Sequence, residues 1–540
     1  MFASCLLVVR FAVGVRTLSD KGKGPAIALV DYDLIIIGAG INGAGVARDA
    51  ALRGLRVLLL DKGDVGGGTS SWSTRLIHGG LRYLEHGEFG LVRESLRERE
   101  TLLRIAPHLV RALPLLIPIY EGARRGRLLL RLGMSVYDLL SLGKTFPHHQ
   151  MLSREQAIAR APGLNTEGLR GAALYYDAQV EFAERLVLEN VLSAVTHGAR
   201  VVTYAGVDSF IVHNQSLIGV EFVDVLNGER QSATAALIIN AAGPWVDQVL
   251  KTTDAGAPLI GGTKGSHLIV PRFSGARETA IYVEARTDQR PFFVIPWNNN
   301  YLIGTTDIRF QGDLDNVRID DDEIDYLLRE TNGVFPAAKL SRADILYSYS
   351  GIRPLPFTRD ADEQSITRRH FIRAHPKFNN LLSLVGGKLT TYRSLAEETT
   401  DLVFEKLGRT SPACLTAEEP LGALSNPIRT SPLTARLSRI YGGRSDAVRE
   451  LVKEDASLGE VFDPETGGVA AEVVYAFRHE FARTLTDCLL RRTMVGLNSS
   501  LGVGADEAAA KIAVKHLGWP EDRARAEVGS YRKFIERFRV

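Results

Sequence analysis

The chain has 540 residues, enough for three or four domains of ordinary size. Lys and Arg together number 65 and Asp and Glu 63, and this near-neutral balance (+2) gives no reason to expect a nucleic-acid partner. Hydrophobic residues at 45% and charged residues at 24% exclude a mainly disordered or coiled-coil chain. The cysteines (Cys5, Cys414 and Cys488) are too far apart for a disulfide scaffold or a C-x-x-C motif, which fits a reducing compartment.

Residues 1–30 have a composition of their own. Arg10 and Arg16 are present, and no acidic residue precedes Asp20. We expect a disordered tail here, and a mitochondrial-type targeting sequence is the alternative. No apolar run in the chain reaches the roughly 18 residues that a membrane-spanning helix needs.

The segment from Asp33 to Asp61 predicts a β–α–β unit. Leu34–Ile37 is a wholly apolar, mostly β-branched run, as in a parallel strand that is buried on both faces. A glycine-rich turn and a helical stretch follow, and a second apolar run ends at Asp61. The three glycines of the turn have the dinucleotide-binding spacing G-x-G-x-x-G: Gly38, Gly40 and Gly43.

This fingerprint predicts a bound dinucleotide. The first glycine permits the tight turn, the second lets the backbone approach the pyrophosphate, and the third lets helix and strand pack closely. Asp61 is placed to accept hydrogen bonds from ribose hydroxyls. The fingerprint alone does not distinguish NAD from FAD. Because the chain carries no comparable second fingerprint, we favour a tightly held flavin.

Residues 66–83 form a polar, glycine-rich segment directly after this unit. Its hydroxyl and backbone N–H groups are suited to wrap a diphosphate, although an ordinary polar loop would have a similar composition. Apolar spacing then predicts helices over residues 89–112 and 180–197. Between them, residues 113–150 mix apolar runs with arginines. Strands are expected at residues 200–204 and 237–240.

Closely spaced strands predict an antiparallel sheet over residues 265–350, at 267–270, 281–283, 292–295 and 301–305. Gly386 and Gly387 precede a helix that we expect to begin at about Leu389. The proline-rich stretch 408–432 is typical of a linker, and the remainder has a helical pattern.

Several motifs together resemble one family. They are GAGINGAG, TSSWSTRLIHGGLRYLEHGEFGLV, NAAGPWVD, KGSHLIVPR, IPW, IGTTD, YSGIRPL and GGKLTTYR, spread over residues 31–408, with a fainter return at 490–493. The chain resembles the FAD-dependent glycerol-3-phosphate dehydrogenases, the aerobic, quinone-linked enzymes. The resemblance implies oxidation of sn-glycerol 3-phosphate to dihydroxyacetone phosphate and transfer of the electrons to a membrane quinone. It also implies peripheral attachment to the inner face of the cell membrane, with the mitochondrial inner membrane as the alternative. A homodimer is left open.

The resemblance also implies roles for individual residues. Arg353 is expected beside the flavin, where it binds the substrate phosphate or polarises the substrate oxygen. Lys388 and Thr391 are candidate phosphate ligands, and Arg82 and Tyr83 join them by family position. His267 is the first candidate for the proton acceptor, although a hydrogen-bonding role suits it equally well, and His78 is the second. The expected cofactor-binding residues are Gly38, Gly40, Gly43, Asp61, Thr69, Ser70, Ser71, Arg75, Leu76, His78, Gly79, Gly243, Gly387, Lys388, Leu389 and Thr390.

The predicted fold class is α/β, with a doubly wound, Rossmann-like FAD-binding domain, an antiparallel β cap for the substrate and a helical C-terminal domain. The expected boundaries are the tail at 1–30, FAD-binding segments at 31–110 and 151–245, a basic and apolar segment at 111–150, the cap at 246–350, a return segment at 351–408, a linker at 409–432 and the C-terminal domain at 433–540.

Rival functions follow from the same residues. A glycerol-3-phosphate oxidase would use oxygen in place of quinone, and an amine or amino-acid oxidase would need a carboxylate clamp. A non-catalytic dinucleotide-binding protein would not need phosphate-matched cations. The P-loop-like residues 143–145 lack the required upstream glycine, and His148 and His149 lack ligands at metal spacing, so no metal is expected. Residues 124–140 combine arginines with leucines and suit either an anionic membrane surface or a basic loop leading into a buried helix.

Overall fold

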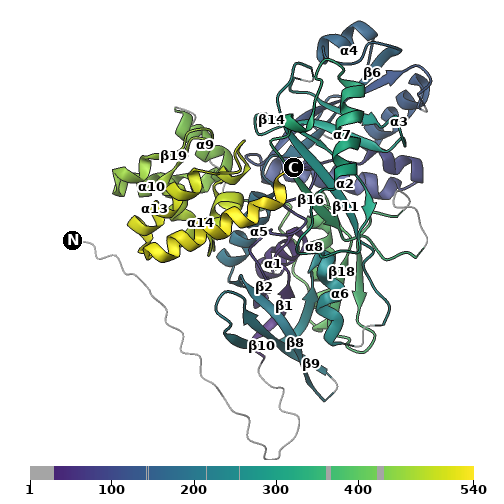
Figure 1. Ribbon diagram of the computed structural model, residues 1–540. Helices are drawn as coiled ribbons and strands as arrows, with labels where there is room; N and C mark the ends of the chain where they lie inside the picture. Colours follow the sequence, from purple (N-terminus) through teal and green to yellow (C-terminus); the bar gives the residue numbers. More distant parts are fainter. Residues whose placement is uncertain are drawn as a thin grey trace, which may run out of the picture.

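The computed structural model describes residues 30–540, apart from 124, 142, 144, 215, 254–255, 276, 360–365 and 423–430. The expected tail, Arg124 and the middle of the expected linker therefore lie outside the described residues. The rest forms two large sheets and a helical C-terminal domain. Figure 1 shows the first sheet below, the second above, and the C-terminal helices to one side. This arrangement confirms the predicted fold class.

The lower sheet is the predicted doubly wound domain. Its strands are ordered β17-β18-β10-β1-β2-β7, and the four pairings from β18 to β7 are parallel. The hairpin of β8 and β9 extends β10, and β17 pairs antiparallel with β18. The bounds are β1 (Tyr32–Ile37), β2 (Val57–Leu60), β7 (Arg200–Val202), β8 (Ala205–His213), β9 (Ser216–Asp224), β10 (Arg230–Asn240), β17 (Phe371–Ala374) and β18 (Leu381–Val385).

Three helices cover one side of this sheet. Helix α1 (Ile41–Leu52) packs against both α5 (Ala183–Thr196) and α8 (Tyr392–Lys406). A large cluster of apolar side chains is buried between these helices and the sheet, and this burial contributes much of the driving force for the domain. Parts of the chain more than 300 residues apart therefore share one core.

The upper sheet forms the cap. Its order is β15-β11-β14-β13-β12-β4-β6-β3, with β16 paired to β11 and β5 to β6. The bounds are β3 (Leu76–Ile77), β4 (Val110–Tyr120), β5 (Gln150–Leu152), β6 (Leu169–Val180), β11 (Thr263–Pro271), β12 (Ala280–Glu284), β13 (Pro291–Trp297), β14 (Asn300–Gly304), β15 (Ile308–Arg309) and β16 (Tyr347–Arg353). Helices α2 (Phe89–Ile105), α3 (Arg127–Leu140), α4 (Arg154–Arg160) and α7 (Asp321–Val334) accompany it.

Three local expectations differ from the structure. Residues 150–180 were placed in the second FAD-binding segment, but β5 and β6 pair within the cap sheet. The helix expected over 89–112 ends at Ile105, and β4 begins at Val110. The helix expected from about Leu389 begins at Tyr392, because residues 388–391 form a turn in which the Thr391 N–H donates to the Lys388 carbonyl.

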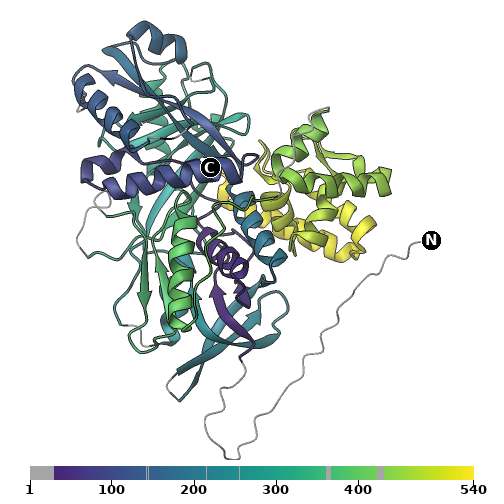
Figure 2. The ribbon, with the colours of Figure 1, turned by 180° about the vertical axis from the view of Figure 1, so that it is seen from behind.

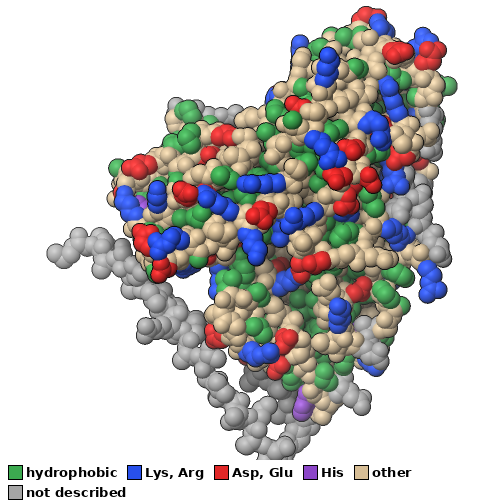
Figure 3. Space-filling view, in the orientation of Figure 1, with side chains coloured by type: hydrophobic (Ala, Val, Ile, Leu, Met, Phe, Trp, Pro, Cys, Tyr) green, Lys and Arg blue, Asp and Glu red, His purple; other side chains and the backbone are tan. Residues whose placement is uncertain are grey.

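The C-terminal domain is mostly helical, with one small hairpin. Figure 2, seen from behind, again shows it beside the two sheets. The bounds are α9 (Pro432–Tyr441), α10 (Ser445–Glu454), β19 (Val461–Asp463), β20 (Gly468–Val469), α11 (Ala470–His479), α12 (Leu485–Asp487), α13 (Ala505–Leu517) and α14 (Glu521–Ile535). On the face in Figure 3, basic and acidic side chains are interspersed.

A buried ion cluster ties this domain to the segment after β2. The Asp64 carboxylate accepts hydrogen bonds from Arg491 Nε at 2.5 Å and from Arg492 at 2.6 and 2.9 Å, and all three side chains are buried. The two arginine charges outweigh burial and hold the pKa of Asp64 below its usual value. Asp64 therefore joins the C-terminal domain to the loop that begins with Asp61.

The substitution Asp64→Asn should destabilise the protein strongly, because it leaves the buried Arg492 without its carboxylate and Arg491 with Asp487 alone. Removing one partner of such a pair costs about 3–5 kcal/mol. Thermal unfolding of the purified protein would measure the loss. The control is Glu121→Gln, which breaks the exposed Arg170–Glu121 pair and should cost about 1 kcal/mol or less. Equal losses of stability in the two variants would contradict the role of Asp64 in joining the C-terminal domain to the loop.

Candidate active site

The turn between β1 and α1 depends on its glycines. Gly38 has a φ of +107°, and a Cβ there would lie 2.6 Å from the Ala241 carbonyl oxygen. A Cβ on Gly43 would lie 1.9 Å from the Gly38 oxygen. At Gly40 the nearest atom to a Cβ is Ser70 Oγ at 3.5 Å, so this side of the turn is open. The open side is where the fingerprint predicts the pyrophosphate.

Polar groups gather around the first turn of α1. Gly40 is its N-cap and supplies no capping side chain. The Ile41 N–H donates to Ser70 Oγ at 3.0 Å, and the Ala39 N–H donates to the Asp61 carboxylate at 2.6 Å. Burial raises the pKa of Asp61. The turn thus presents backbone donors and one carboxylate at the carboxyl end of β2, where parallel sheets bind ligands.

The segment 66–83 is fastened to the protein at several of its predicted cofactor-binding residues. Thr69 Oγ1 donates to the Ile352 carbonyl at 2.6 Å, and the buried Ser71 Oγ donates to Gly66 at 2.6 Å. The Arg75 guanidinium forms a two-point ion pair with Glu184 at 2.7 and 2.8 Å. We therefore assign the Arg75 side chain to holding this segment in place, and Leu76 lies buried in β3.

The return segment after β18 lies against α1. Gly387 has a φ of +92°, and a Cβ there would lie 2.8 Å from the Asn42 side-chain nitrogen. Asn42 Nδ2 donates to the Gly386 carbonyl at 3.2 Å, whereas its buried Oδ1 has no hydrogen-bond partner among the described residues. Gly243 starts a short 3-10 turn with a φ of +55° and open space where its Cβ would be.

Arg353 lies at the end of β16, at the edge of the cap that is nearest to the segment 66–83. Its guanidinium donates to Asp307 Oδ1 at 3.0 Å, to Thr305 Oγ1 at 3.0 Å and to the Thr306 carbonyl at 3.1 Å. Burial lowers its pKa from the usual value, but an arginine remains charged at physiological pH. A Cβ on Gly265 would lie 2.3 Å from this guanidinium, so that glycine makes room for it.

The Lys388 side chain lies against the face of the Tyr83 ring. The Lys388 ammonium lies 4.6 Å from the centre of the Tyr83 ring and donates to Ser95 Oγ at 2.7 Å. Burial lowers the pKa of Lys388 to about 7. Burial also raises the pKa of Tyr83, against the charges of Arg368 and Arg82. Arg82 and Tyr83 belong to one 3-10 turn (Leu81–His86) that follows Gly80, where a Cβ would lie 2.1 Å from the Tyr83 ring.

His267 is more enclosed than a proton acceptor in direct contact with substrate would be. The side chain lies on β11 with 1% of its surface exposed, and Nε2 is 2.9 Å from Thr74 Oγ1. Nδ1 is buried and has no partner among the described residues. Burial and the charge of Arg353 hold the pKa of His267 well below 6.5, so the ring is neutral. The hydrogen bond of its ring to a side chain is the one to the Thr74 hydroxyl, and a role for His267 with substrate stays a prediction.

The remaining predicted site residues lie in the segment 66–83 and in the turn before α8. The His78 N–H donates to Thr390 Oγ1 at 3.2 Å, and burial lowers the pKa of His78 to about 4. Thr390 and Thr391 are both 1% exposed, and Leu389 lies in the same turn. The Gly79 N–H donates to the Tyr137 hydroxyl at 3.0 Å. The first contact fastens the segment 66–83 to the return segment and the last fastens it to α3, and a role for each residue in binding stays a prediction.

Comparison with known proteins decides the family. A family model described as "FAD dependent oxidoreductase" matches residues 33–402, and one for the "C-terminal domain of alpha-glycerophosphate oxidase" matches residues 382–524. The chain belongs to the FAD-dependent oxidoreductases. It is thus an FAD-dependent enzyme, and its relatives include several glycerol-3-phosphate dehydrogenases.

Three relatives show how far the similarity extends. A glycerol-3-phosphate dehydrogenase from Synechocystis is 45% identical, over 95% of this chain and 98% of that protein. The aerobic glycerol-3-phosphate dehydrogenase of Escherichia coli is 39% identical, over 86% and 94%. The structure of glycerol-3-phosphate dehydrogenase from Bacillus halodurans, complexed with FAD, matches with a TM-score of 0.77 at 28% identity, over 94% of this chain and 95% of that one.

The residues of this oxidoreductase fit the flavin nucleotide. Gly40 leaves clearance over the first turn of α1, where backbone N–H groups and the helix dipole suit a diphosphate. Asp61 directly follows β2, where its carboxylate would accept hydrogen bonds from ribose hydroxyls. The buried Asn42 Oδ1, which has no partner among the described residues, lies beside Gly387 and can accept a hydrogen bond there. FAD would therefore lie between the β1–α1 turn, the segment 66–83 and the return segment.

Asp307 and Arg368 belong to this site, although the sequence analysis gave them no role. Asp307 accepts from Arg353 at 3.0 Å and from Arg368 at 2.9 Å, so it holds two arginines together. Their charges outweigh burial and keep the pKa of Asp307 below its usual value. Asp307 ends the quoted motif IGTTD, which is a signal that could have revealed it. Arg368 lies in no recognised motif, and only the fold brings it to Arg353.

The substitution Gly40→Val should weaken FAD binding without unfolding the protein. The backbone at Gly40 (φ −72°) is open to any residue, and only Ser70 Oγ lies near a Cβ there. A side chain would instead occupy the space for the pyrophosphate. We expect FAD affinity to fall at least about tenfold, which corresponds to about 1.4 kcal/mol. Titration of the apoprotein with FAD, followed by flavin fluorescence, measures it.

Gly90→Val is the matched control, because Gly90 lies on α2 with open space around its Cβ. Unaltered FAD affinity in Gly40→Val would show that the pyrophosphate does not approach this turn. A similar loss in both variants would point to a general effect on folding.

Proposed function

We propose that this enzyme oxidises sn-glycerol 3-phosphate to dihydroxyacetone phosphate and passes the electrons to a membrane quinone. The observation that carries the proposal is a group of cationic side chains at the cap edge beside the flavin site. Its members are Arg82, Arg353, Arg368 and Lys388, with Asp307 between two of them. Such a group matches a phosphate dianion.

Each side chain has a distinct part in the proposed reaction. Arg353 binds the phosphate or polarises the substrate oxygen, and its permanent charge makes it a poor base. Lys388 contributes a second cation that is held by Ser95 and the Tyr83 ring. When bound, FAD supplies the hydride acceptor for the substrate carbon. The substrate hydroxyl donates its proton toward Thr74 and the neutral His267, which holds the proton only in passing because burial and the charge of Arg353 keep its pKa well below 6.5.

The relatives raise two questions of specificity: which phosphorylated alcohol is the substrate, and which molecule accepts the electrons. D-Erythritol 1-phosphate dehydrogenase from Brucella abortus is also 39% identical, over 85% of this chain, so a longer phosphorylated alcohol is the second candidate substrate. Oxygen is the alternative acceptor. Solved oxidases of amino acids and of glycerophosphate share the fold at 20% identity or less, which supports the architecture alone.

Steady-state rates with matched substrates and acceptors test the proposal. We expect the highest kcat/KM with glycerol 3-phosphate, a lower one with erythritol 1-phosphate, and none measurable with glycerol, because glycerol lacks the anion. We expect quinone reduction to exceed hydrogen peroxide formation. A higher kcat/KM with erythritol 1-phosphate would show that this longer alcohol is the substrate. Formation of one hydrogen peroxide per substrate oxidised would show that the enzyme is an oxidase.

The pH dependence of kcat/KM should follow the protonation state of Lys388. Its pKa of about 7 means that the side chain is charged below pH 7 and neutral above it. kcat/KM for glycerol 3-phosphate should therefore fall above pH 7, by up to about tenfold per pH unit. Lys388→Arg remains charged, so its profile should be flatter. Lys251→Arg, at an exposed lysine, is the control and should keep the wild-type profile. A parallel fall in Lys388→Arg would assign the dependence to another group.

Helix α3 is the surface that we propose contacts the membrane. No helix among the described residues is both long and apolar enough to cross a bilayer. On α3, however, three leucines are 58–82% exposed beside two exposed arginines: Leu128, Leu129, Leu132, Arg127 and Arg131. Such a mixture suits an anionic lipid surface. Arg125 does not contribute, because Glu85 and Glu284 pair with it.

Replacing Leu128 and Leu132 together by Gln should weaken membrane attachment. Insertion of each leucine side chain into lipid is worth about 1.5–3 kcal/mol, so we expect at least a tenfold loss of binding. Flotation with vesicles of phosphatidylcholine and phosphatidylglycerol measures it. Val212→Gln removes an exposed apolar side chain from β8 and is the control. Undiminished flotation of the double variant would exclude α3 as the attachment surface.

A further inference from the structure

A buried carboxylate on α7 connects two parts of the cap that carry site residues. Glu323 is the third residue of α7, and 2% of its surface is exposed. Its Oε1 atom accepts hydrogen bonds from Ser266 Oγ at 2.9 Å and from Thr306 Oγ1 at 2.6 Å. Ser266 directly precedes His267, and Thr306 directly precedes Asp307. One oxygen atom therefore joins the neighbours of two site residues.

The second oxygen of this carboxylate is occupied as well. Glu323 Oε2 accepts from the Asp320 N–H at 3.0 Å and pairs with the Lys264 ammonium at 2.9 Å. Lys264 is 3% exposed, and it also pairs with the Asp320 carboxylate at 2.5 Å and donates to the Arg318 carbonyl at 3.1 Å. Buried charges persist when they are paired and hydrogen-bonded in this way. The contacts on both oxygens hold the carboxylate in one orientation.

Hydroxyl groups extend these contacts across the cap sheet. Thr306 Oγ1 accepts from the Ser266 N–H at 2.9 Å while it donates to Glu323. Ser266 Oγ also donates to Glu323 and lies 2.7 Å from Ser350 Oγ, which is therefore the donor of that contact. Ser350 lies on β16, three residues before Arg353. We call the following residues the Glu323 network: Lys264, Ser266, Thr306, Asp320, Glu323 and Ser350. The network connects α7 with β11, with β16 and with the turn after β14.

The turn after β14 holds the Arg353 guanidinium. Its acceptors there are three consecutive residues, at 3.0–3.1 Å: Thr305 Oγ1, the Thr306 carbonyl and the Asp307 carboxylate. Thr306 is the middle residue of the three, and its side chain is bound by Glu323. The buried carboxylate is thus one residue removed from the contacts that orient the arginine.

We propose that Glu323 is a positioning residue for the oxidation of glycerol 3-phosphate. It fixes the turn 305–307, and this turn holds Arg353 in the orientation that binds the substrate. Because groups of the protein occupy both of its oxygens, Glu323 acts through Thr306 and does not contact the substrate. A displacement of about 1 Å at a positioned group can cost about 100-fold in rate. The inference rests on the proposed function, because it assigns the residue that aligns Arg353 for that substrate.

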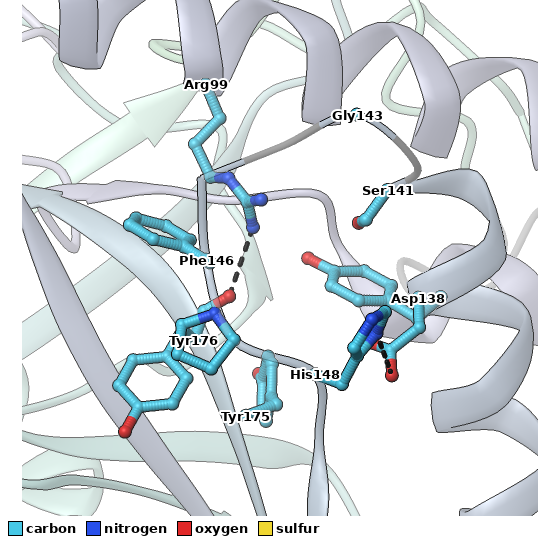
Figure 4. Close-up of a pocket in the computed structure, with 10 residues that line it drawn as sticks. Arg99, Asp138, Ser141, Gly143, Phe146, His148, Tyr175 and Tyr176 are labelled. Atoms are coloured by element: carbon cyan, nitrogen blue, oxygen red, sulfur yellow. Dashed lines mark hydrogen bonds and ion pairs between the residues drawn. The ribbon is translucent and has the colours of Figure 1, made fainter.

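The network is separate from a cavity in another part of the cap. This cavity has a volume of about 130 Å³ and is formed by α2, α3, the segment that follows α3, and β6, as Figure 4 shows. None of its lining residues belongs to the Glu323 network. Substitutions in the network therefore leave the lining of this cavity unaltered.

The substitution Glu323→Gln tests the proposal. An amide has a single acceptor oxygen, so it cannot serve both the two hydroxyls and the Asp320 N–H with Lys264. We expect the KM for glycerol 3-phosphate, measured with a soluble dye as acceptor, to rise at least about tenfold while FAD affinity stays unchanged. Titration of the oxidised holoenzyme with dihydroxyacetone phosphate, followed in the flavin spectrum, should show the same loss of affinity without turnover.

Glu472→Gln is the matched control. Glu472 is also the third residue of its helix, α11, is fully buried, accepts the Val469 N–H and pairs with a cation, Arg436. It lies in the C-terminal domain, so its loss should lower stability and leave KM unchanged. A purely structural loss reduces the amount of active enzyme, which lowers kcat and flavin content together and does not raise KM.

The Thr306 hydroxyl gives a second test if Glu323→Gln does not fold. Thr306→Val keeps the shape of the side chain and removes its hydroxyl, so KM should rise as in Glu323→Gln. Thr306→Ser retains the hydroxyl and should restore most of the affinity. Thr331→Val makes the same change on α7, at a buried hydroxyl without a partner among the described residues, and should keep the wild-type KM.

The double variant tests whether Glu323 acts through Thr306. Its KM should be close to that of Thr306→Val alone, because both substitutions remove one shared contact. Additive effects would show that Glu323 acts by another route and would overturn the proposal.

The outcomes separate this inference from the proposed function. If the wild type oxidises glycerol 3-phosphate and Glu323→Gln and Thr306→Val keep its KM, the positioning role is excluded and the proposed function stands. An equal rise of KM in Glu472→Gln would also exclude that role. If the wild type does not oxidise glycerol 3-phosphate, both proposals fail together.

Discussion

The register of β11 against β14 and β16 is the constraint on which the site depends. His267 on β11 pairs with Gly304 on β14, where a Cβ would lie 2.5 Å from the imidazole ring. Thr263 pairs with Arg353 on β16, and a Cβ on Gly265 would collide with the arginine head group. A shift of one residue would turn every side chain of β11 to the opposite face. Glycine lowers strand stability, and here it provides the space that the functional side chains occupy.

This cap edge becomes a reaction site because other segments are fastened to it. Thr69 binds the Ile352 carbonyl, which joins the flavin-binding segment to β16 one residue before Arg353. The fully buried Arg75–Glu184 pair anchors the same segment to α5 in the cofactor domain. Asp64 and the two C-terminal arginines hold its beginning. The cations proposed to bind phosphate, the glycine-rich turn and the proposed proton route are thus held by contacts that cross all three parts of the protein.

Features that depend on residues close together in the chain could be predicted from the sequence. The β–α–β unit and its glycines were recognisable because the residues that pack together follow one another within 30 positions. Long-range partners were not recognisable. The ion pair of Arg75 with Glu184, 109 residues away, could not be predicted, because nothing near Arg75 in the sequence indicates it. The segment that contains β6 was placed in the FAD-binding domain for the same reason, since the sequence of a strand does not identify its pairing partner. Arg368 became visible only through Asp307.

The most direct test is the visible spectrum of the holoenzyme without oxygen, before and after glycerol 3-phosphate is added. The account predicts that the flavin band bleaches in the wild type and in Arg373→Ala, which removes an exposed arginine of β17. The band should persist with glycerol, and Arg353→Ala should keep its flavin but bleach at least about 100-fold more slowly, equivalent to about 2.7 kcal/mol. A flavin that glycerol 3-phosphate does not reduce in the wild type would contradict the assigned substrate and leave only the fold.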